Sequence, residues 1–217
     1  MEKTIKFDYL IVPCPGDPSF KEDKVEFFDI EDKLYLGAED RMKAATMIAR
    51  DAEKVILVGG SQSKVVAMFI YFKKEMKKFG FEDNDQLICL VSKPGSTGNL
   101  SAFKKYYNRG GNKEDTVAII SNYYHLPRLK LIWKSLFPEK IILEENYISA
   151  EEILGEGTKD QLHEKELRHR RVTEEPGRRD WRNNSYDNQD KIETWDNEFW
   201  KCEELMLDFK ILPNKPI

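Results

Sequence analysis

Short apolar runs alternate with longer amphipathic stretches over about the first 150 residues. Four runs, at residues 8–12, 54–58, 86–91 and 117–120, are rich in aliphatic and β-branched residues. An apolar run without regular polar positions is typical of a strand that is buried on both faces of a parallel sheet. We therefore predict four buried strands, and a fifth, short one at residues 140–143.

The segments between these runs have apolar residues at helical spacing, and the connections are short. They predict helices at residues 40–50, 64–79, 100–108 and 126–137. Repetition of strand and helix with short connections favours a doubly wound parallel sheet with helices on both faces. The sequence thus predicts an α/β domain with a sheet of about five strands.

The chain changes character after residue 150. Residues 151–186 are dense in charge and poor in aliphatic side chains. Further on, apolar residues recur at alternating spacings of three and four, namely Ile192, Trp195, Phe199, Cys202, Met206 and Phe209. Such a stripe predicts an amphipathic helix that docks on the core, with a dimer interface as the alternative. We therefore divide the chain into a domain at residues 1–150 and an extension at 151–217, and no oligomeric state follows.

Composition narrows the classes of partner. The formal net charge of −4 is small for 217 residues and leaves no concentrated basic surface, so neither nucleic acid nor an anionic membrane is expected as partner. No stretch resembles a signal peptide or a membrane span. The three isolated cysteines are typical of reduced thiols. Together these features predict a cytoplasmic protein.

Two segments that follow predicted strands have the composition of anion-binding turns. The candidates are Gly59, Gly60 and Ser61 after the second strand, and Ser96, Thr97 and Asn99 after the third. Glycine lets a ligand approach the backbone, and the N–H groups of a helix N-terminus favour phosphate or carboxylate. The alternative is that these residues only turn the chain and cap the helices.

Polar and titratable residues also follow the fourth strand. Asn122, His125 and Arg128 lie where that strand ends and the next helix begins. In open α/β sheets this edge is where ligands bind. Arg128 is suited to grip a carboxylate or phosphate, and His125 to contact an anion or move a proton. We assign both a binding role and leave catalysis by His125 open.

Arg41, Ser61 and two histidines are further candidates for binding, catalysis or metal coordination. Arg41 lies in the first turn of the first helix, which is unfavourable for a cation unless an anion is near, so it joins the candidates. A Ser61 nucleophile with His125 as its base lacks an evident carboxylate to orient the imidazole. His163 and His169 have no companion set of ligands, so no metal site is predicted.

Several of these segments, in this order, resemble the SanA/YdcF/ElyC family, a bacterial domain of unknown function. The resemblance covers about residues 8–143. The matching pieces are the strand DYLIV, Arg41 in the first helix, VILVGGSQS, Ser96-Thr97-Gly98-Asn99 and AIISNYYHLPR. The chain departs from the family at Gly98 and Lys64, where the family often has acidic residues, and at its Pro-Cys-Pro-Gly turn.

The resemblance implies a Rossmann-like α/β domain with a pocket formed by these loops. Some relatives bind S-adenosylmethionine or similar nucleotides, so such a ligand is implied here too. Other relatives are anchored in a membrane, and this chain lacks their N-terminal anchor.

Three hypotheses of function result. The first is a domain that binds a nucleotide-like or phosphorylated small molecule at the carboxyl edge of the sheet. The second is a hydrolase or transferase with His125 as acid or base. The third is a non-catalytic interaction module that uses the C-terminal aromatic helix. The first requires His125 and Arg128 to meet the glycine turns at one edge. It would be contradicted if the imidazole and the guanidinium were enclosed inside the protein, or if they faced away from those turns.

Overall fold

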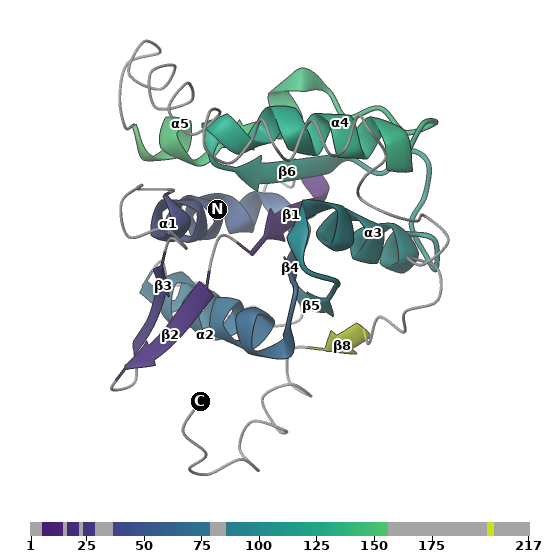
Figure 1. Cartoon of the computed structure of the whole chain (residues 1–217). Coiled ribbons are helices and arrows are strands. Elements are labelled where there is room, and N and C mark those ends of the chain that lie inside the picture. Colours follow the sequence, from purple (N-terminus) through teal and green to yellow (C-terminus); the bar gives the residue numbers. More distant parts are fainter. Residues whose placement is uncertain are drawn as a thin grey trace.

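The computed structural model of the 217-residue chain describes residues 6–14, 17–21, 24–28, 37–78, 86–155 and 199–201. Within these residues, a central sheet is covered by helices on both faces (Figure 1). A small antiparallel hairpin, β2 (Asp17–Lys21) and β3 (Lys24–Phe28), lies beside the helix α2 (Figure 1).

Five parallel strands form the sheet, which confirms the predicted α/β fold. They are β1 (Phe7–Pro13), β4 (Ala52–Gly59), β5 (Leu87–Val91), β6 (Val117–Ser121) and β7 (Tyr147–Ser149). The strand order is β7-β6-β1-β4-β5-β8, in which β8 (Phe199–Lys201) is an added antiparallel strand beside β5. The strand β1 pairs in parallel with both β4 and β6. The chain therefore builds the sheet outward from β1 in one direction, then returns to build it in the other. This reversal places a topological switch point between β1 and β6.

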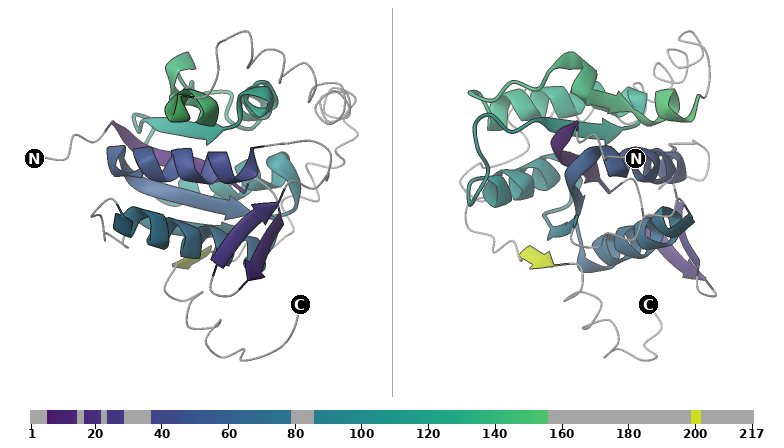
Figure 2. Two further views of the ribbon diagram at one scale, coloured as in Figure 1. Left: turned by 90° about the vertical axis from the view of Figure 1, so that its left-hand side faces the viewer. Right: turned by 180° about the vertical axis from the view of Figure 1, so that it is seen from behind.

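Helices cover the two faces in pairs. The helices α1 (Ala38–Ile48) and α2 (Gln62–Lys78) pack on one face, and α3 (Gly95–Tyr107) and α4 (Leu126–Leu136) on the other. A short helix, α5 (Ala150–Leu154), contributes to the α1 side. In the left view of Figure 2, α1 and α2 lie in front of the sheet. A 3-10 turn, η1 (Ala49–Asp51), leads from α1 into β4.

The alternation of side chains along each strand explains the two layers. Leu10 and Leu57 point to the α1 and α2 side, whereas Ile11 and Ile56 point to the α3 and α4 side, and all four are buried. Both sets are aliphatic because both faces are covered, which is why these strands read as continuous apolar runs. Sequence periodicity therefore located the first four parallel strands within two residues of their observed ends.

The predicted strand at residues 140–143 is wrong. The chain there runs as a connection after α4, with Ile141 85% and Leu143 57% exposed. The strand that pairs with β6 is β7, with Ile119 opposite Tyr147. The 3-10 turn η3 (Glu144–Asn146) comes first, and its Asn146 amide donates to the Val117 carbonyl. Two short apolar runs compete for one sheet edge here, and only tertiary packing selects between them.

The predicted C-terminal helix is also wrong where the structure describes it. Phe199–Lys201 is the strand β8, which pairs antiparallel with β5 and places Phe199 opposite Leu90. The unpaired edge of β5 offers hydrogen-bond partners, and Phe and Trp favour strands. The other residues of the predicted apolar stripe lie outside the described residues.

The cysteines differ from the expectation of three reduced thiols. Cys14 is free, whereas Cys89 is disulfide-bonded. Disulfides are rare in cytosolic proteins, so one support for a cytoplasmic location is lost. Separately, none of the helices within the described ranges has the length and apolar character that crossing a membrane requires.

Buried phenols on the α3 side predict a loss of stability at alkaline pH. Tyr9 and Tyr107 pack edge to face, with ring centroids 5.6 Å apart. Burial, followed by the charge of Asp115, raises the pKa of each phenol to about 12. An exposed tyrosine titrates near pH 10, so between these values the folded state keeps protons that the unfolded state releases. Stability is fully present below about pH 10 and falls as the pH rises towards 12.

Urea unfolding at pH 8, 9, 10 and 11 measures this dependence. The double variant Tyr9→Phe/Tyr107→Phe should lose less stability between pH 9 and 11 than the natural chain. The stability of the double variant should still fall with pH, because burial also raises the pKa of Tyr71 and Tyr147. An equal decline in both proteins would contradict the assignment to Tyr9 and Tyr107.

Candidate functional site

The switch point between β1 and β6 is filled by a buried arginine. Arg41, in the first turn of α1, donates from Nε to Asn122 Oδ1 at 2.9 Å. One of its terminal nitrogens donates to the carbonyl of Pro13, the last residue of β1, at 3.3 Å. The guanidinium therefore joins the ends of two strands, at the place where open α/β sheets usually admit a ligand.

Asn122 is the centre of this arrangement and has 0% of its surface exposed. Its Nδ2 donates to the Gly37 carbonyl at 3.0 Å and to Glu151 Oε1 at 3.1 Å. The other carboxylate oxygen of Glu151 accepts from the Tyr123 backbone N–H and from the Ser149 hydroxyl, each at 2.9 Å. We call these three side chains the Arg41–Asn122–Glu151 cluster; it ties α1, β6 and α5 together.

Glu151 was missed in the sequence because the strand before it was misplaced. A signal was present, since Ser149 and Glu152 have the spacing of a helix cap. The structure confirms that cap, with Ser149 Oγ accepting from the Glu152 N–H at 3.4 Å. If the last strand had been predicted to end at Ser149, this cap would have placed Glu151 at the carboxyl edge of the sheet.

The loops after β4 and β5 pack directly on one another. A Cβ on Gly60 would lie 2.7 Å from the Cα of Pro94, so only glycine allows this approach. The Ser92 N–H donates to the Gly59 carbonyl at 2.8 Å, and the Ser92 hydroxyl donates to Asn99 Oδ1 at 2.6 Å. Gly59, Gly60 and Asn99 therefore belong to one continuous stretch of the edge.

Residues 95–99 are the first turn of α3, and the predicted helix start at residue 100 is wrong. Gly, Ser and Thr are weak helix formers, which hid this turn. Packing outweighs that preference, because a Cβ on Gly98 would lie 2.1 Å from the Lys93 carbonyl oxygen. The same contact leaves no room for a side chain at residue 98. Ser96, Thr97 and Asn99 are thus placed at a helix N-terminus.

Ser61 has the role of a helix cap. Its Oγ accepts from the Lys64 N–H at 3.3 Å, at the start of α2, and lies 3.0 Å from Ser63 Oγ. The alternative prediction, that these residues cap helices, therefore holds for Ser61. Capping still leaves Ser61 beside Gly60 at the same edge.

His125 ends the 3-10 turn η2 (Tyr123–His125) and contacts a hydroxyl at each ring nitrogen. Nδ1 lies 2.9 Å from Ser121 Oγ, and Nε2 lies 2.8 Å from Ser96 Oγ. A terminal nitrogen of Arg128 donates to Ser96 Oγ at 3.0 Å and lies 3.1 Å from His125 Nε2. The structure therefore brings Ser96, which follows β5, together with His125 and Arg128, which follow β6.

These three residues differ in exposure. His125 has 6% and Ser96 8% of the surface exposed, whereas Arg128 is half-buried. The imidazole is thus largely enclosed, but it faces the turn after β5 and not away from it.

Charge divides the carboxyl edge into two halves. The helices α2, α3 and α4 begin there, and none has an acidic residue in its first turn. Lys64, Lys93 and Arg128 lie in or just before those turns, and all are half-buried. In contrast, α1 and α5 begin with the acidic pairs Glu39 and Asp40, and Glu151 and Glu152. We call the part of the edge formed by α2, α3 and α4 the positive half, because among the described residues its helix starts hold cations and no acidic residue.

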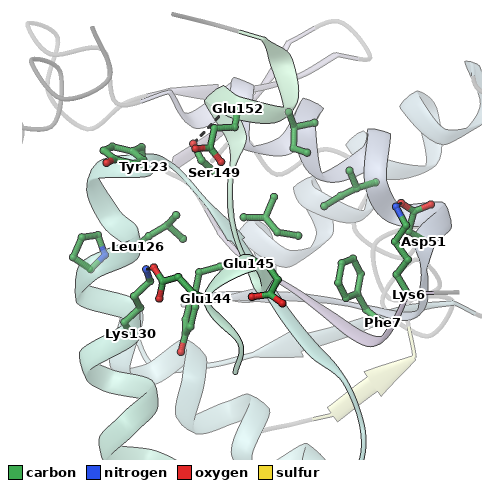
Figure 3. Close-up of a pocket in the computed structure, with 15 residues that line it drawn as sticks. Lys6, Phe7, Asp51, Tyr123, Leu126, Lys130, Glu144, Glu145, Ser149 and Glu152 are labelled. Carbon is green, nitrogen blue, oxygen red and sulfur yellow. Dashed lines mark hydrogen bonds and ion pairs between the residues drawn. The ribbon is translucent and has the colours of Figure 1, made fainter. Parts of the chain in front are cut away.

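A separate cavity of about 790 Å³ lies beside β7 (Figure 3). Tyr123 and Leu126 lie on one side of it, and the ion pair of Lys6 and Asp51, 3.3 Å apart, on another. Burial, and then the charge of Glu144, raises the pKa of Tyr147 in its wall. None of the ten predicted site residues lines this cavity. In the part of the chain that the structure describes, no group of three His, Cys, Asp or Glu side chains could hold a metal.

Replacing Asn122 by Ala should destabilise the fold. The change removes the partners of a buried guanidinium and a buried carboxylate, which costs about 2–4 kcal/mol. Asn108→Ala is the matched control, because Asn108 is exposed at the end of α3 and its loss should cost less than about 0.5 kcal/mol. Urea unfolding measures both variants. Equal stability of the two would show that the cluster does not hold the edge together.

No family model, no curated protein and no solved structure matches this chain. The chemistry of its residues is therefore the basis for assigning a function.

Proposed function

We propose that this protein binds a small anionic molecule, phosphorylated or nucleotide-like, at the positive half of the carboxyl edge. The observation that carries the proposal is that α2, α3 and α4 begin there without acidic residues, beside Lys64, Lys93 and Arg128. Each helix N-terminus carries roughly half a positive charge and unpaired N–H donors. An anion at these termini would accept from the N–H groups of the first turns and would be attracted by the three cations.

The residues divide into contacts and supports. Arg128 grips the anion with its planar fork, and the backbone N–H groups of Ser96, Thr97 and Asn99 line the first turn of α3. Gly59 and Gly60 are supports, because they let the loop after β5 pack closely beside the cap of α2 at Ser61. Arg41 and Asn122 are supports in this proposal, because both are buried in contacts with Pro13, Gly37 and Glu151.

The resemblance to the SanA/YdcF/ElyC family supports the same assignment. S-adenosylmethionine shares a nucleoside and a carboxylate with this class of ligand, but its sulfonium and ammonium groups make it a net cation, so only its carboxylate suits Arg128. A cytoplasmic location remains part of the proposal, although the disulfide of Cys89 weighs against it. The interaction module built on a C-terminal aromatic helix is not retained, because Phe199–Lys201 is a strand of the sheet.

A catalytic role is the second candidate, and one contact favours it. Ser96 Oγ lies 2.8 Å from His125 Nε2, which is within reach for proton transfer. A hydrolase or transferase that uses His125 as acid or base is compatible with binding of the same anion.

Calorimetric titration with inorganic phosphate, AMP and S-adenosylmethionine tests the binding proposal. Arg128→Ala should lower the affinity for whichever of these anions binds by about tenfold to hundredfold, since hydrogen bonds to a charged group contribute about 1.5–3 kcal/mol. The affinity of Arg128→Lys should lie between those of the natural chain and Arg128→Ala, because lysine keeps the charge but cannot bind an anion bidentately.

Arg109→Ala is the matched control. Arg109 is exposed and follows α3 at the amino edge of the sheet, away from the proposed site. Its loss should leave binding unchanged. Equal affinities of Arg128→Ala and Arg109→Ala, with both variants folded by circular dichroism, would refute the proposed site.

A further inference from the structure

We propose that Ser96 is a nucleophile, activated by His125, and that the site hydrolyses small phosphate monoesters. This inference rests on the proposed function for the class of ligand, because the anion held by Arg128 would be the reacting group. It goes beyond binding by assigning a reaction and the residues that perform it.

The hydrogen-bond pattern fixes where the protons lie. Arg128 has only donors, so Ser96 Oγ accepts from its terminal nitrogen at 3.0 Å. The Ser96 hydroxyl hydrogen is then left for His125 Nε2, 2.8 Å away. A proton on Nε2 would face the donating Arg128 nitrogen 3.1 Å away, so the unprotonated form is favoured and its single lone pair accepts the Ser96 hydroxyl. Nε2 therefore carries the lone pair, which assigns the tautomer from the network.

The other ring nitrogen supports the same assignment. With Nε2 unprotonated, neutral His125 has its proton on Nδ1, which donates to Ser121 Oγ at 2.9 Å. Ser121 is buried at the end of β6 and is rigidly placed by the sheet. A nucleophile, a base and a third group that orients the base are the elements of an activated serine. The orienting group here is a hydroxyl, where the sequence offered no carboxylate.

The surroundings of Ser96 suit a phosphoryl group in particular. Ser96 lies in the first turn of α3, whose N–H groups favour an anion. The guanidinium of Arg128 contacts Ser96 Oγ itself, so an anion paired with Arg128 is held next to the nucleophile. Proton transfer to His125 puts a second cation beside Arg128, which a phosphate dianion offsets. These features favour attack at the bound anion.

The reaction balances with water alone. Ser96 Oγ forms a bond to phosphorus as the ester P–O bond breaks, and the Ser96 proton passes through His125 Nε2 to the leaving oxygen. Water then attacks the phosphoserine and gives a proton to Nε2, which returns it to Ser96. The net change converts a phosphate monoester and water into an alcohol and inorganic phosphate. Arg128 and the N–H groups of α3 stabilise the equatorial oxygens in both steps.

Labelling of the full chain with a fluorophosphonate probe tests the nucleophile. The probe transfers a phosphonyl group to activated serines, and tandem mass spectrometry locates the modified residue. We expect modification at Ser96, its absence in Ser96→Ala and a rate at least tenfold lower in His125→Ala. Ser101→Ala is the matched control, because Ser101 is buried in the same helix and should leave labelling unchanged. Ser121→Ala should shift the pH profile of labelling, which a purely structural role would not do.

Hydrolysis of p-nitrophenyl phosphate and p-nitrophenyl acetate tests the substrate class. We expect release of p-nitrophenol from the phosphate and its loss in Ser96→Ala. Cleavage of the acetate alone would overturn the assignment to phosphate esters. An unmodified Ser96, or equal labelling of His125→Ala, would overturn the nucleophile. Phosphate binding that persists and depends on Arg128 would then leave the binding proposal intact, so the two failures can be told apart.

Discussion

A buried charge network at the switch point of the sheet shapes the rest of this protein. Burying a guanidinium and a carboxylate is costly unless hydrogen bonds satisfy both. Asn122 meets that need, because it accepts from Arg41 and donates to Glu151. The same contacts fix the end of β1, the start of α1 and the start of α5 relative to β6. The crevice that a doubly wound sheet usually opens between its two halves is therefore filled from within.

Because that crevice is filled, the polar side chains left to contact a ligand lie on the α3 and α4 side of the edge. The acidic first turns of α1 and α5 gather around the Arg41–Asn122–Glu151 cluster, while α2, α3 and α4 begin without acidic residues. His125 lies next to the boundary, since it follows Asn122 by one 3-10 turn and contacts Ser96. One half of the edge thus stabilises the fold, and the other has the charge and donors for an anion.

Local pattern predicted the fold well where both faces of a strand are buried. It failed where tertiary contacts choose between similar segments. Residues 140–143 and 147–149 are both short apolar runs, and Phe199–Lys201 lies in a stripe with helical spacing, yet sheet edges at β6 and β5 decide the outcome. For the site, strand ends correctly indicated Ser96, His125 and Arg128 as neighbours. The partners Ser121 and Glu151 were missed, because no local signal reports a hydrogen bond between distant strands.

Binding of an anion at the N-termini of α2, α3 and α4, as we propose, would perturb the backbone N–H groups of those first turns. Amide chemical shifts of isotopically labelled protein, followed during titration with inorganic phosphate, test it most directly. The account predicts saturable shifts at Lys64, Ser96 and Thr97, together with Arg128, and none at Lys113 and Glu114 near the opposite edge. Shifts confined to that opposite edge, or none under saturating phosphate, would contradict it.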